Sequence, residues 1–269
     1  MEDAGVDPGS IDLVIVATAT PDHPMPATAC QVQNAIGALR AGAFDLNAGC
    51  SGFVYGLVMG HQAIASGEHR LVLVVGADTL SRTLDWQDRN TCVLFGDGAG
   101  AVLLRANEGP AGVLATVLGA DGAGADLLTI PAGGSAMPPT AETLTAKAHC
   151  LRMDGRQVFR FASRVVPQAV HEVTRKAGLR VSQLDWVIPH QANLRIIEAA
   201  AKRLDLPQER FYLDLERYGN TSAASVPIAL CEAVAEGKVQ PGQILVLVGF
   251  GAGLTWAAAA LRWTLAPEG

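Results

Sequence analysis

The second half of the chain repeats, in the same order, the patterns of its first half. Four pairs of segments correspond, and they are 11–15 with 184–188, 44–67 with 211–237, 71–76 with 244–249, and 100–104 with 255–263. A period of half the chain predicts an internal duplication, because solenoid repeats have periods of only about 20–50 residues. We therefore expect two similar halves packed side by side, residues 1–108 and residues 109–269.

The repeated segments alternate between strand patterns and helix patterns. Short aliphatic and β-branched runs such as 11–17 and 244–249 are typical of buried strands, and stretches with helical spacing lie between them. A chain of 269 residues can bury a large core, so an α/β fold is predicted. We expect Pro167 to kink or split a helix over 155–177. We also expect the Gly- and Pro-rich segment 119–149 to be an irregular surface loop.

The composition narrows the possible functions. The net charge of −6 gives no overall signal for nucleic acid. The uncharged stretch 244–260 is interrupted by glycines, which favours two buried strands over a membrane span. Five scattered cysteines without a CxxC pair fit a reducing compartment, and the acidic N-terminus is unlike a signal peptide. A cytoplasmic protein is therefore predicted.

A lone cysteine, Cys50, lies where a predicted strand ends and a predicted helix begins. The free N–H groups of a first helical turn carry partial positive charge, so they favour a thiolate and lower its pKa by about 1–5 units. A small buried apolar cysteine is the alternative interpretation. In the duplication, Asn220 holds the place of Cys50. The two residues are therefore expected to face each other between the halves.

Three further segments have more than one interpretation. His190 follows a predicted strand, at the edge where α/β proteins bind ligands, although a structural hydrogen bond is the alternative. Asn220 alone would be an ordinary helix cap. The segment 249–253 is either a tight turn or a set of backbone donors for an oxyanion. The order Cys, His, Asn would also fit a papain-like protease, but the sequence around Cys50 lacks the local signature of that family. A dinucleotide motif at 96–101 fails because a strand follows it.

Five segments together resemble β-ketoacyl-acyl-carrier-protein synthase III, a condensing enzyme with the thiolase fold. They are AGCSGF at 48–53, FGDGAGA at 95–101, PHQANLRI at 189–196, YGNTSAAS at 218–225 and GFGAGLTW at 249–256. The resemblance implies a thiolase-like α/β fold in which two duplicated βα halves stack in five layers, αβαβα. It also implies decarboxylative condensation of an acyl-CoA starter, acetyl-CoA first of all, with malonyl-acyl carrier protein. That reaction initiates type II fatty acid synthesis.

The resemblance assigns a role to each candidate residue. Cys50 would attack the acyl-CoA thioester and hold the acyl group, while the backbone N–H groups of Cys50 and Ala252 would bind the oxyanion. His190 and Asn220 would donate hydrogen bonds to the malonyl thioester oxygen as carbon dioxide leaves. His190 would thus act as a neutral donor and not as a general base. No metal and no redox cofactor is expected.

Binding residues are implied by single positions that match the family, some of them outside the five motifs. The residues implied for CoA and pantetheine are Arg89, Phe159, Ala192, Asn193 and Arg195. The residues implied for the acyl pocket are Met25, Leu80 and Met153, and in a homodimer Met25 would reach into the partner's pocket. The residues predicted to bind acidic acyl carrier protein are Arg160, Arg195, Lys202 and Arg203, although a solvated helix face is the alternative. No nucleic acid and no membrane partner is expected.

The chain departs from the family at its start. Members carry roughly sixty residues before the strand at 11–17, including a first strand whose second-half counterpart lies at 113–118. In a sheet of order 3-2-1-4-5 that strand would be central, and its loss would leave buried backbone groups unpaired, at about 1–3 kcal/mol each. We expect a first half without its first strand, in a truncated protein. The alternative functions are an inactive fragment, or a related synthase that uses branched or longer starters in secondary metabolism.

Overall fold

Two four-stranded mixed sheets form the framework of the molecule. The computed structural model describes residues 4–109 and 111–264. The first sheet has the order β2-β1-β3-β4, and these strands are Gly42–Leu46, Leu13–Ala17, Leu71–Thr79 and Asp97–Arg105. β1 runs parallel to β2 and β3, whereas β4 runs antiparallel to β3.

The second sheet repeats most of the first. Its order is β5-β10-β9-β8, and these strands are Gly112–Ala120, Thr255–Arg262, Ile244–Gly251 and Trp186–Pro189. β8 runs parallel to β9 and β10 runs antiparallel to it, so β8-β9-β10 matches β1-β3-β4 in order and direction. A parallel bridge between Phe211 and Val187 stands where β2 pairs with β1. The predicted duplication is confirmed, while its division between residues 108 and 109 stays a prediction.

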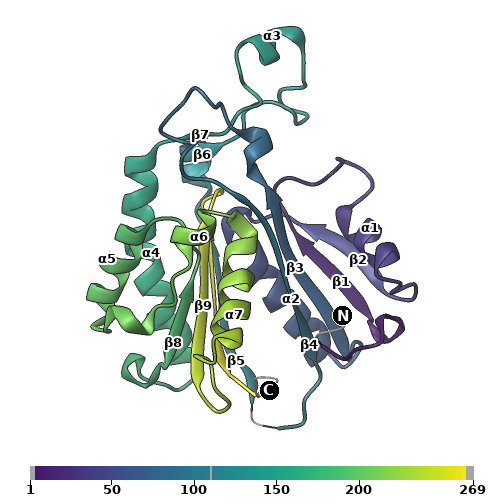
Figure 1. Cartoon of the computed structure of the whole chain (residues 1–269), viewed down its shortest axis with the longest axis vertical. Coiled ribbons are helices and arrows are strands. Elements are labelled where there is room, and N and C mark those ends of the chain that lie inside the picture. The colour runs from purple at the N-terminus through teal and green to yellow at the C-terminus, as the bar shows by residue number, and fades with distance from the viewer. Residues whose placement is uncertain (1–3, 110, 265–269) are drawn as a thin grey trace.

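The sheets and helices stack in the five layers that were predicted (Figure 1). α1 (Thr28–Ala35) covers the outer face of the first sheet, and α2 (Gly52–Ala65) and α7 (Ser225–Ala235) lie between the sheets. α4 (Gly155–Lys176) and α5 (Leu194–Leu204) cover the outer face of the second sheet. None of the helices in the described ranges combines the length and the apolarity that a membrane span needs.

Alternation of side chains along the central strands produces this layering. In β9, Leu245 and Leu247 pack into the core between the sheets, whereas Val246 and Val248 pack into the core with α4 and α5. β3 divides its side chains between two cores in the same way. Because successive residues of a strand point to opposite faces, a strand that is apolar at every position must be covered on both faces.

The expected gap in the middle of the first sheet is wrong. β1 and β3 pair directly, from Leu13 opposite Val72 to Ala17 opposite Gly76. In the second sheet the segment 113–118 belongs to β5, which is an edge strand beside β10. Its counterpart in the first half would lie beside β4, where no strand of the described residues pairs on the side away from β3. A further strand would therefore extend an edge, and the central ladder is complete without it.

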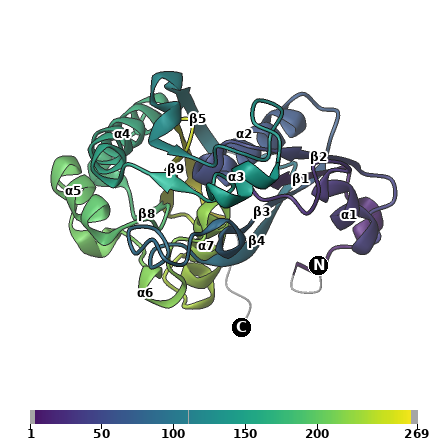
Figure 2. The same cartoon turned by 90° about the horizontal axis from the view of Figure 1, so that it is seen from above.

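Three local expectations also need correction. α4 continues through Pro167, because one missing N–H removes a single hydrogen bond from a 22-residue helix that is packed on the second sheet. Residues 97–100 begin β4 instead of forming a turn, since they pair with 76–79 of β3. The segment 119–149 contains β6 (Leu128–Thr129), which pairs with β7 (Arg152–Met153), and the short helix α3 (Ala141–Thr145). α3 projects above the sheets in Figure 1, and Figure 2 shows it from above.

Candidate active site

Cys50 lies between the two sheets, in a tight turn that leads into α2. The turn is the 3-10 segment Gly49–Ser51, which directly precedes the helix, and the cysteine side chain is buried. β9 passes so close that a Cβ atom on Gly251 would lie 2.6 Å from the backbone nitrogen of Cys50. The glycines at 249 and 251 therefore belong to a strand that supports the cysteine, and not to a turn.

His190 follows β8, as predicted, and its ring is buried. Its backbone N–H donates to the carbonyl of Val248 at 2.8 Å, and its ring packs edge-on against Phe250 with the centroids 5.1 Å apart. Nδ1 lies 2.6 Å from Oγ of Ser225, which leaves Nε2 for a ligand. Burial lowers the pKa of His190 to about 3, so the imidazole is neutral at physiological pH.

Asn220 lies on the matching connection of the second half, shortly before α7. Its backbone forms a parallel bridge with Phe95, and its side-chain oxygen accepts the backbone N–H of Ser222 at 2.9 Å. This hydrogen bond leaves the amide nitrogen as a donor for a ligand. The turns Gly49–Ser51 and Ser222–Ala224 contact each other, so the two halves meet at the places that the duplication predicts.

Cys50, His190 and Asn220 line one pocket, which has a volume of about 760 Å³. Its apolar walls include Leu94, Phe95, Leu128, Met153, Val158, Phe159, Ile196 and Phe250. Its polar lining includes Asp88, Asn90, Asp126, Arg152, Asp154, Arg156 and Asn193. A pocket that combines apolar walls with convergent polar groups is typical of a small-molecule site.

The acidity of Cys50 differs from the sequence-based expectation. The position at a helix N-terminus is confirmed. Burial nevertheless raises the pKa of the Cys50 thiol to about 12, against a hydrogen bond from Ser222 that lowers it, and the carboxylate of Asp78 raises it further. Desolvation of the charged form therefore outweighs the helix terminus. The resting enzyme holds a thiol, and the thiolate needs local donors when it forms.

This raised pKa predicts how Cys50 reacts with iodoacetamide. At a pKa of about 12, only about one thiol in ten thousand is ionised at pH 8. The rate of alkylation, followed by mass spectrometry of the Cys50 peptide, is therefore expected to rise about tenfold per pH unit from pH 7 to pH 10. A plateau reached below pH 9 would show that the thiol is more acidic than its burial indicates.

The two backbone groups proposed for an oxyanion lie on adjacent segments. Ala252 directly follows β9, and a Cβ atom on Gly49 would lie 3.0 Å from the backbone nitrogen of Ala252. The amide of Cys50 follows in the same turn. The two N–H groups thus come from different elements that lie against each other, and their role stays a prediction.

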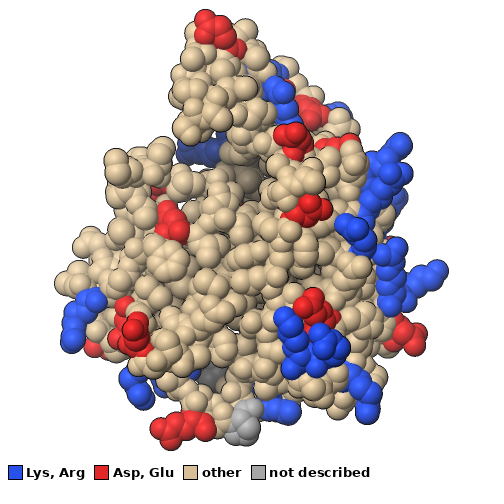
Figure 3. Space-filling view, turned by 180° about the vertical axis from the view of Figure 1, so that it is seen from behind, with Lys and Arg blue, Asp and Glu red and all other residues tan. Residues whose placement is uncertain are grey.

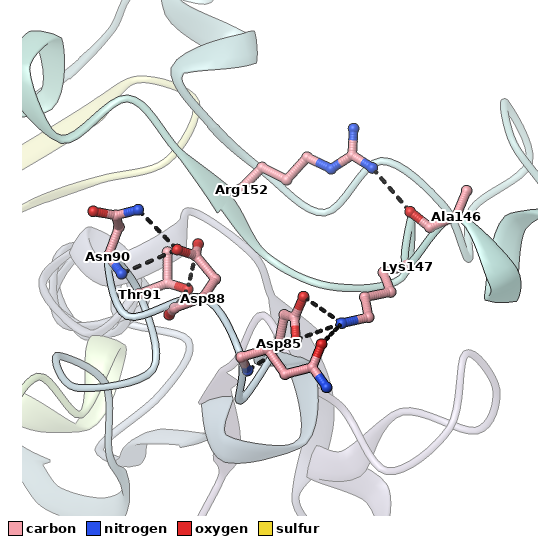
Figure 4. Close-up of polar contacts among 8 residues, drawn as sticks. Asp85, Asp88, Asn90, Thr91, Ala146, Lys147 and Arg152 are labelled. Atoms are coloured by element: carbon pink, nitrogen blue, oxygen red, sulfur yellow. Dashed lines mark hydrogen bonds and ion pairs between the residues drawn. The ribbon is translucent and has the colours of Figure 1, made fainter.

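Two segments that contribute residues to the pocket lining are tied together (Figure 4). Lys147 bonds Asp85 at 2.8 Å and also bonds Gln87, which joins the segment 119–149 to the loop after β3. Arg152 lines the pocket and donates to the carbonyl of Ala146 at 3.4 Å.

Arg89 is exposed and does not line the pocket, although both of its neighbours do. Its predicted contact with CoA stays a prediction.

Of the other residues predicted to bind substrate, some line the pocket and some lie outside it. Phe159, Ala192, Asn193 and Met153 line the pocket. Arg195 is exposed outside it, and the side chain of Asn193 caps α5 by accepting the N–H of Arg195 at 2.9 Å. Leu80 is buried in a neighbouring cluster and does not line the pocket, and Met25 is 86% exposed.

The predicted basic residues lie on α4 and α5. Arg160, Arg195, Lys202 and Arg203 are exposed. Figure 3 shows Lys and Arg side chains gathered along one side of the molecule, the side on which Figure 1 shows these two helices. The guanidinium of Arg203 donates to the carbonyl of Ser163 at 2.7 Å, so this arginine joins α5 to α4.

Three residues around the site were missed by the sequence analysis. Ser222 and Ser225 contact Cys50 and His190, respectively, and both belong to the motif 218–225, in which only Asn220 was assigned a role. Asp78, at the end of β3, is 2% exposed and accepts the backbone N–H groups of Ala19, Thr20 and Ala223. A serine-rich helix start was the available signal for the serines. Asp78 gave no signal, because its partners lie far away in the sequence.

A buried cysteine, a neutral histidine and an asparagine amide on one pocket define an acyl-transfer site on a duplicated α/β fold. Comparisons with known proteins agree with this class. The family model of 3-oxoacyl-[acyl-carrier-protein] synthase III matches residues 44–122, and the model of its C-terminal part matches residues 174–263.

Relatives and solved structures give the same result. The β-ketoacyl-[acyl-carrier-protein] synthase III of Symbiobacterium thermophilum is 54% identical over 98% of this chain and 80% of its own. The synthase III structure from Aquifex aeolicus is 44% identical over 97% and 80% of the two chains, with a TM-score of 0.89. A priming β-ketosynthase of the R1128 polyketide pathway is 38% identical over 99% and 79%, with a TM-score of 0.90. This chain belongs to the β-ketoacyl-[acyl-carrier-protein] synthase III family of condensing acyltransferases.

Proposed function

We infer that this chain condenses an acyl-CoA with malonyl-acyl carrier protein, giving β-ketoacyl-acyl carrier protein, carbon dioxide and CoA. This is the step that initiates type II fatty acid synthesis. The observation that carries the inference is the convergence of Cys50, His190 and Asn220 on one pocket. The nucleophile comes from the first half of the chain and the two donors come from the second.

In the first half-reaction Cys50 takes the acyl group. Its sulfur attacks the thioester carbon, and the N–H groups of Cys50 and Ala252 bind the oxygen that becomes negative. The bond to the CoA sulfur then breaks, and the proton lost from Cys50 ends on the CoA thiol. Burial of Cys50 keeps water away from the acyl-enzyme.

In the second half-reaction His190 and Asn220 stabilise the enolate that forms as carbon dioxide leaves. A neutral imidazole donates from Nε2 in the tautomer whose Nδ1 carries no proton, and a hydrogen bond accepted by Nδ1 favours that tautomer. The hydroxyl of Ser225, whose Oγ lies 2.6 Å from Nδ1, can donate that bond. The carbonyl of Ser222 is the other acceptor within reach of this hydroxyl, and it already accepts the backbone N–H of Ser225. The enolate carbon then attacks the acyl group on Cys50.

The function is tested with a panel of acyl-CoA starters and malonyl-acyl carrier protein. We propose acetyl-CoA as the starter, so acetyl-CoA is expected to give the highest kcat/KM for product formation. Absence of product with every starter would contradict the proposed function. A preference for branched or longer acyl groups would favour the alternative, a priming enzyme of secondary metabolism. The similarity to the R1128 priming β-ketosynthase supports that alternative.

We propose that acyl carrier protein docks on α5 beside the pocket. Ala192 and Asn193 line the pocket directly before α5, and Arg195 and Lys202 are exposed on the helix two turns apart. Arg195→Glu combined with Lys202→Glu is expected to raise KM for malonyl-acyl carrier protein about tenfold and to spare acylation by acyl-CoA. Steady-state kinetics with each substrate varied in turn measure both effects.

A matched control reverses two exposed charges, one in the last turn of α4 and one just beyond that helix. Arg175→Glu combined with Arg180→Glu makes the same change in net charge, and both residues are exposed. KM is expected to stay within about twofold of wild type for this control. An equal rise in KM for both double variants would mean that overall charge matters and that α5 is not the docking face.

We propose that the protein works as a homodimer joined along β2. β2 is an edge strand, and Met25, Leu39 and Phe44 on or near it expose large apolar side chains. A second copy would cover them and would let Met25 reach the partner's acyl pocket. Light scattering should then give twice the chain mass of 28.0 kDa. A monomer at micromolar concentration would contradict this proposal.

We further propose that the reaction uses no metal and no redox cofactor, because the chain and the two thioesters supply every group in the steps above. The proposed location is the cytoplasm. Cys30, Cys50, Cys92 and Cys150 are free thiols, which a reducing compartment preserves.

A further inference from the structure

The hydroxyl of Ser222 lies against the sulfur of Cys50. Oγ is 3.3 Å from Sγ, and Ser222 is 2% exposed. Within the described part of the chain, the sulfur is the one hydrogen-bond partner of this hydroxyl. Because a buried hydroxyl is normally hydrogen-bonded, its O–H is directed at the nucleophile.

The backbone of Ser222 has a conformation that disfavours a side chain. Its φ is +52°, in the left-handed region that glycine adopts far more readily than serine. Its N–H donates to Asn220 Oδ1 at 2.9 Å, and the next N–H, of Ala223, donates to Asp78 Oδ2 at 3.2 Å. Residues other than glycine with a left-handed backbone concentrate at functional sites. A position that suits glycine is thus occupied by a residue whose side chain reaches the nucleophile.

We propose that Ser222 is a further catalytic residue, whose hydroxyl donates a hydrogen bond to the Cys50 sulfur whenever negative charge develops there. The proposal rests on the function proposed above, and it concerns the sulfur and not the malonyl group. The hydroxyl keeps its own proton throughout. A hydrogen bond to an ionised acceptor is stronger than one to a neutral acceptor, so the contact favours the thiolate over the resting thiol.

Negative charge develops on this sulfur twice in the cycle. In acylation the sulfur loses its proton and bonds the acyl carbon, the bond from that carbon to the CoA sulfur breaks, and the CoA thiol carries the proton away. In condensation the enolate carbon bonds the same acyl carbon, and Cys50 leaves as a thiolate that takes up one proton from solvent. Decarboxylation places its charge on the malonyl thioester oxygen instead, beside His190 and Asn220.

The acidity of the thiol is consistent with this role. Burial raises the pKa of Cys50, and the hydrogen bond from Ser222 is the largest influence that lowers it. The backbone N–H of Cys50 itself is the other lowering influence, and its effect is smaller. A buried cysteine with a high pKa gains more from such a donor than an exposed one, because few other groups solvate its charge.

Two variants, Ser222→Ala and Ser222→Gly, separate the hydroxyl from the backbone. Both remove the hydroxyl and keep the backbone N–H that holds Asn220, but only the glycine variant removes the conformational strain. Both are expected to slow acylation of Cys50 by acetyl-CoA by roughly 10- to 100-fold in single-turnover mass measurements. Both should also shift the alkylation of Cys50 by iodoacetamide to higher pH. Decarboxylation of malonyl-acyl carrier protein without acyl-CoA is expected to stay within about twofold of wild type.

Melting temperatures complete the test, since the glycine variant should be at least as stable as the wild type. Acylation at the wild-type rate in either variant would overturn the proposal. So would an equal fall in acylation and decarboxylation, because that result indicates a purely structural role. A wild-type enzyme that forms no product would contradict the proposed function instead, and the alkylation curves, which need no acyl substrate, would still report on Ser222.

Discussion

Replacing Cys50 by serine is expected to lower acylation by acyl-CoA at least about 1,000-fold while decarboxylation of malonyl-acyl carrier protein continues. A serine hydroxyl is a far weaker nucleophile than a thiol, and His190 does not serve as its general base, because Nδ1 is bonded to Ser225 and Nε2 carries the proton in the proposed mechanism. The two donors for decarboxylation stay in place, since the hydrogen bonds that hold them join His190 to Ser225 and Asn220 to Ser222. Release of labelled carbon dioxide and the mass of the acyl-enzyme measure the two half-reactions separately.

The complementary variant is His190→Ala, and it should show the reverse pattern. Loss of one preorganised donor to the enolate oxygen is expected to slow decarboxylation by about 100- to 1,000-fold. Acylation should fall much less, because the oxyanion of that step is bound by backbone N–H groups of Cys50 and Ala252. If each variant lost both half-reactions equally, the nucleophile and the donors would not act separately, and the proposed division of roles would be wrong.

Two of the catalytic residues could be located because they follow strands that are visible in the sequence. His190 follows an apolar run directly, Cys50 follows one after residues 47–49, and the duplication pairs Cys50 with Asn220. Five-layer stacking was implied by the family resemblance, and the local pattern agrees with it, since 71–76 and 244–249 are apolar at every position and must be covered on both faces. Periodicity and order along the chain indicated where the candidate residues lie, and the resemblance assigned their roles.

What could not be predicted depends on contacts between distant segments. The pKa of Cys50 was expected to be low because the helix start is local, whereas the burial that raises it comes from β9 and from the turn Ser222–Ala224. The contact of Ser222 with Cys50 spans the two halves in the same way. The mid-sheet gap was wrong because the place of a strand in a sheet is set by pairing partners, which β5 shows only once it lies beside β10.

Asp78 illustrates how the halves hold each other in register at the site. One of its carboxylate oxygens accepts the N–H groups of Ala19 and Thr20 in the first half, and the other accepts the N–H of Ala223 in the second. The same charge raises the pKa of Cys50. The carboxylate that holds the turn of Ser222 in place therefore also disfavours the Cys50 thiolate. The hydroxyl of Ser222 has the opposite effect, because its hydrogen bond lowers the pKa of Cys50.

Close contact between the halves makes Gly76→Ala the most disruptive of the small changes considered. Gly76 lies in β3, and a Cβ atom there would be 2.2 Å from the carbonyl oxygen of Ala223 and 2.8 Å from its carbonyl carbon. Neither group is a flexible side-chain end, so the turn Ser222–Ala224 must move away from β3. Overpacking of this kind costs about 1–3 kcal/mol or more, which corresponds to a melting temperature lower by about 3–10 °C for a chain of this size.

The same movement should carry Ser222 and Asn220 away from Cys50, so both half-reactions are expected to fall by at least about tenfold. Gly122→Ala is the matched control, because a Cβ atom there meets nothing within 4 Å. Its melting temperature should stay within about 1 °C of wild type, with normal activity. Calorimetry and the two half-reaction assays test the pair of variants. Wild-type acylation and decarboxylation by Gly76→Ala would show that the site tolerates separation of its halves, contrary to the close contact on which the proposed mechanism depends.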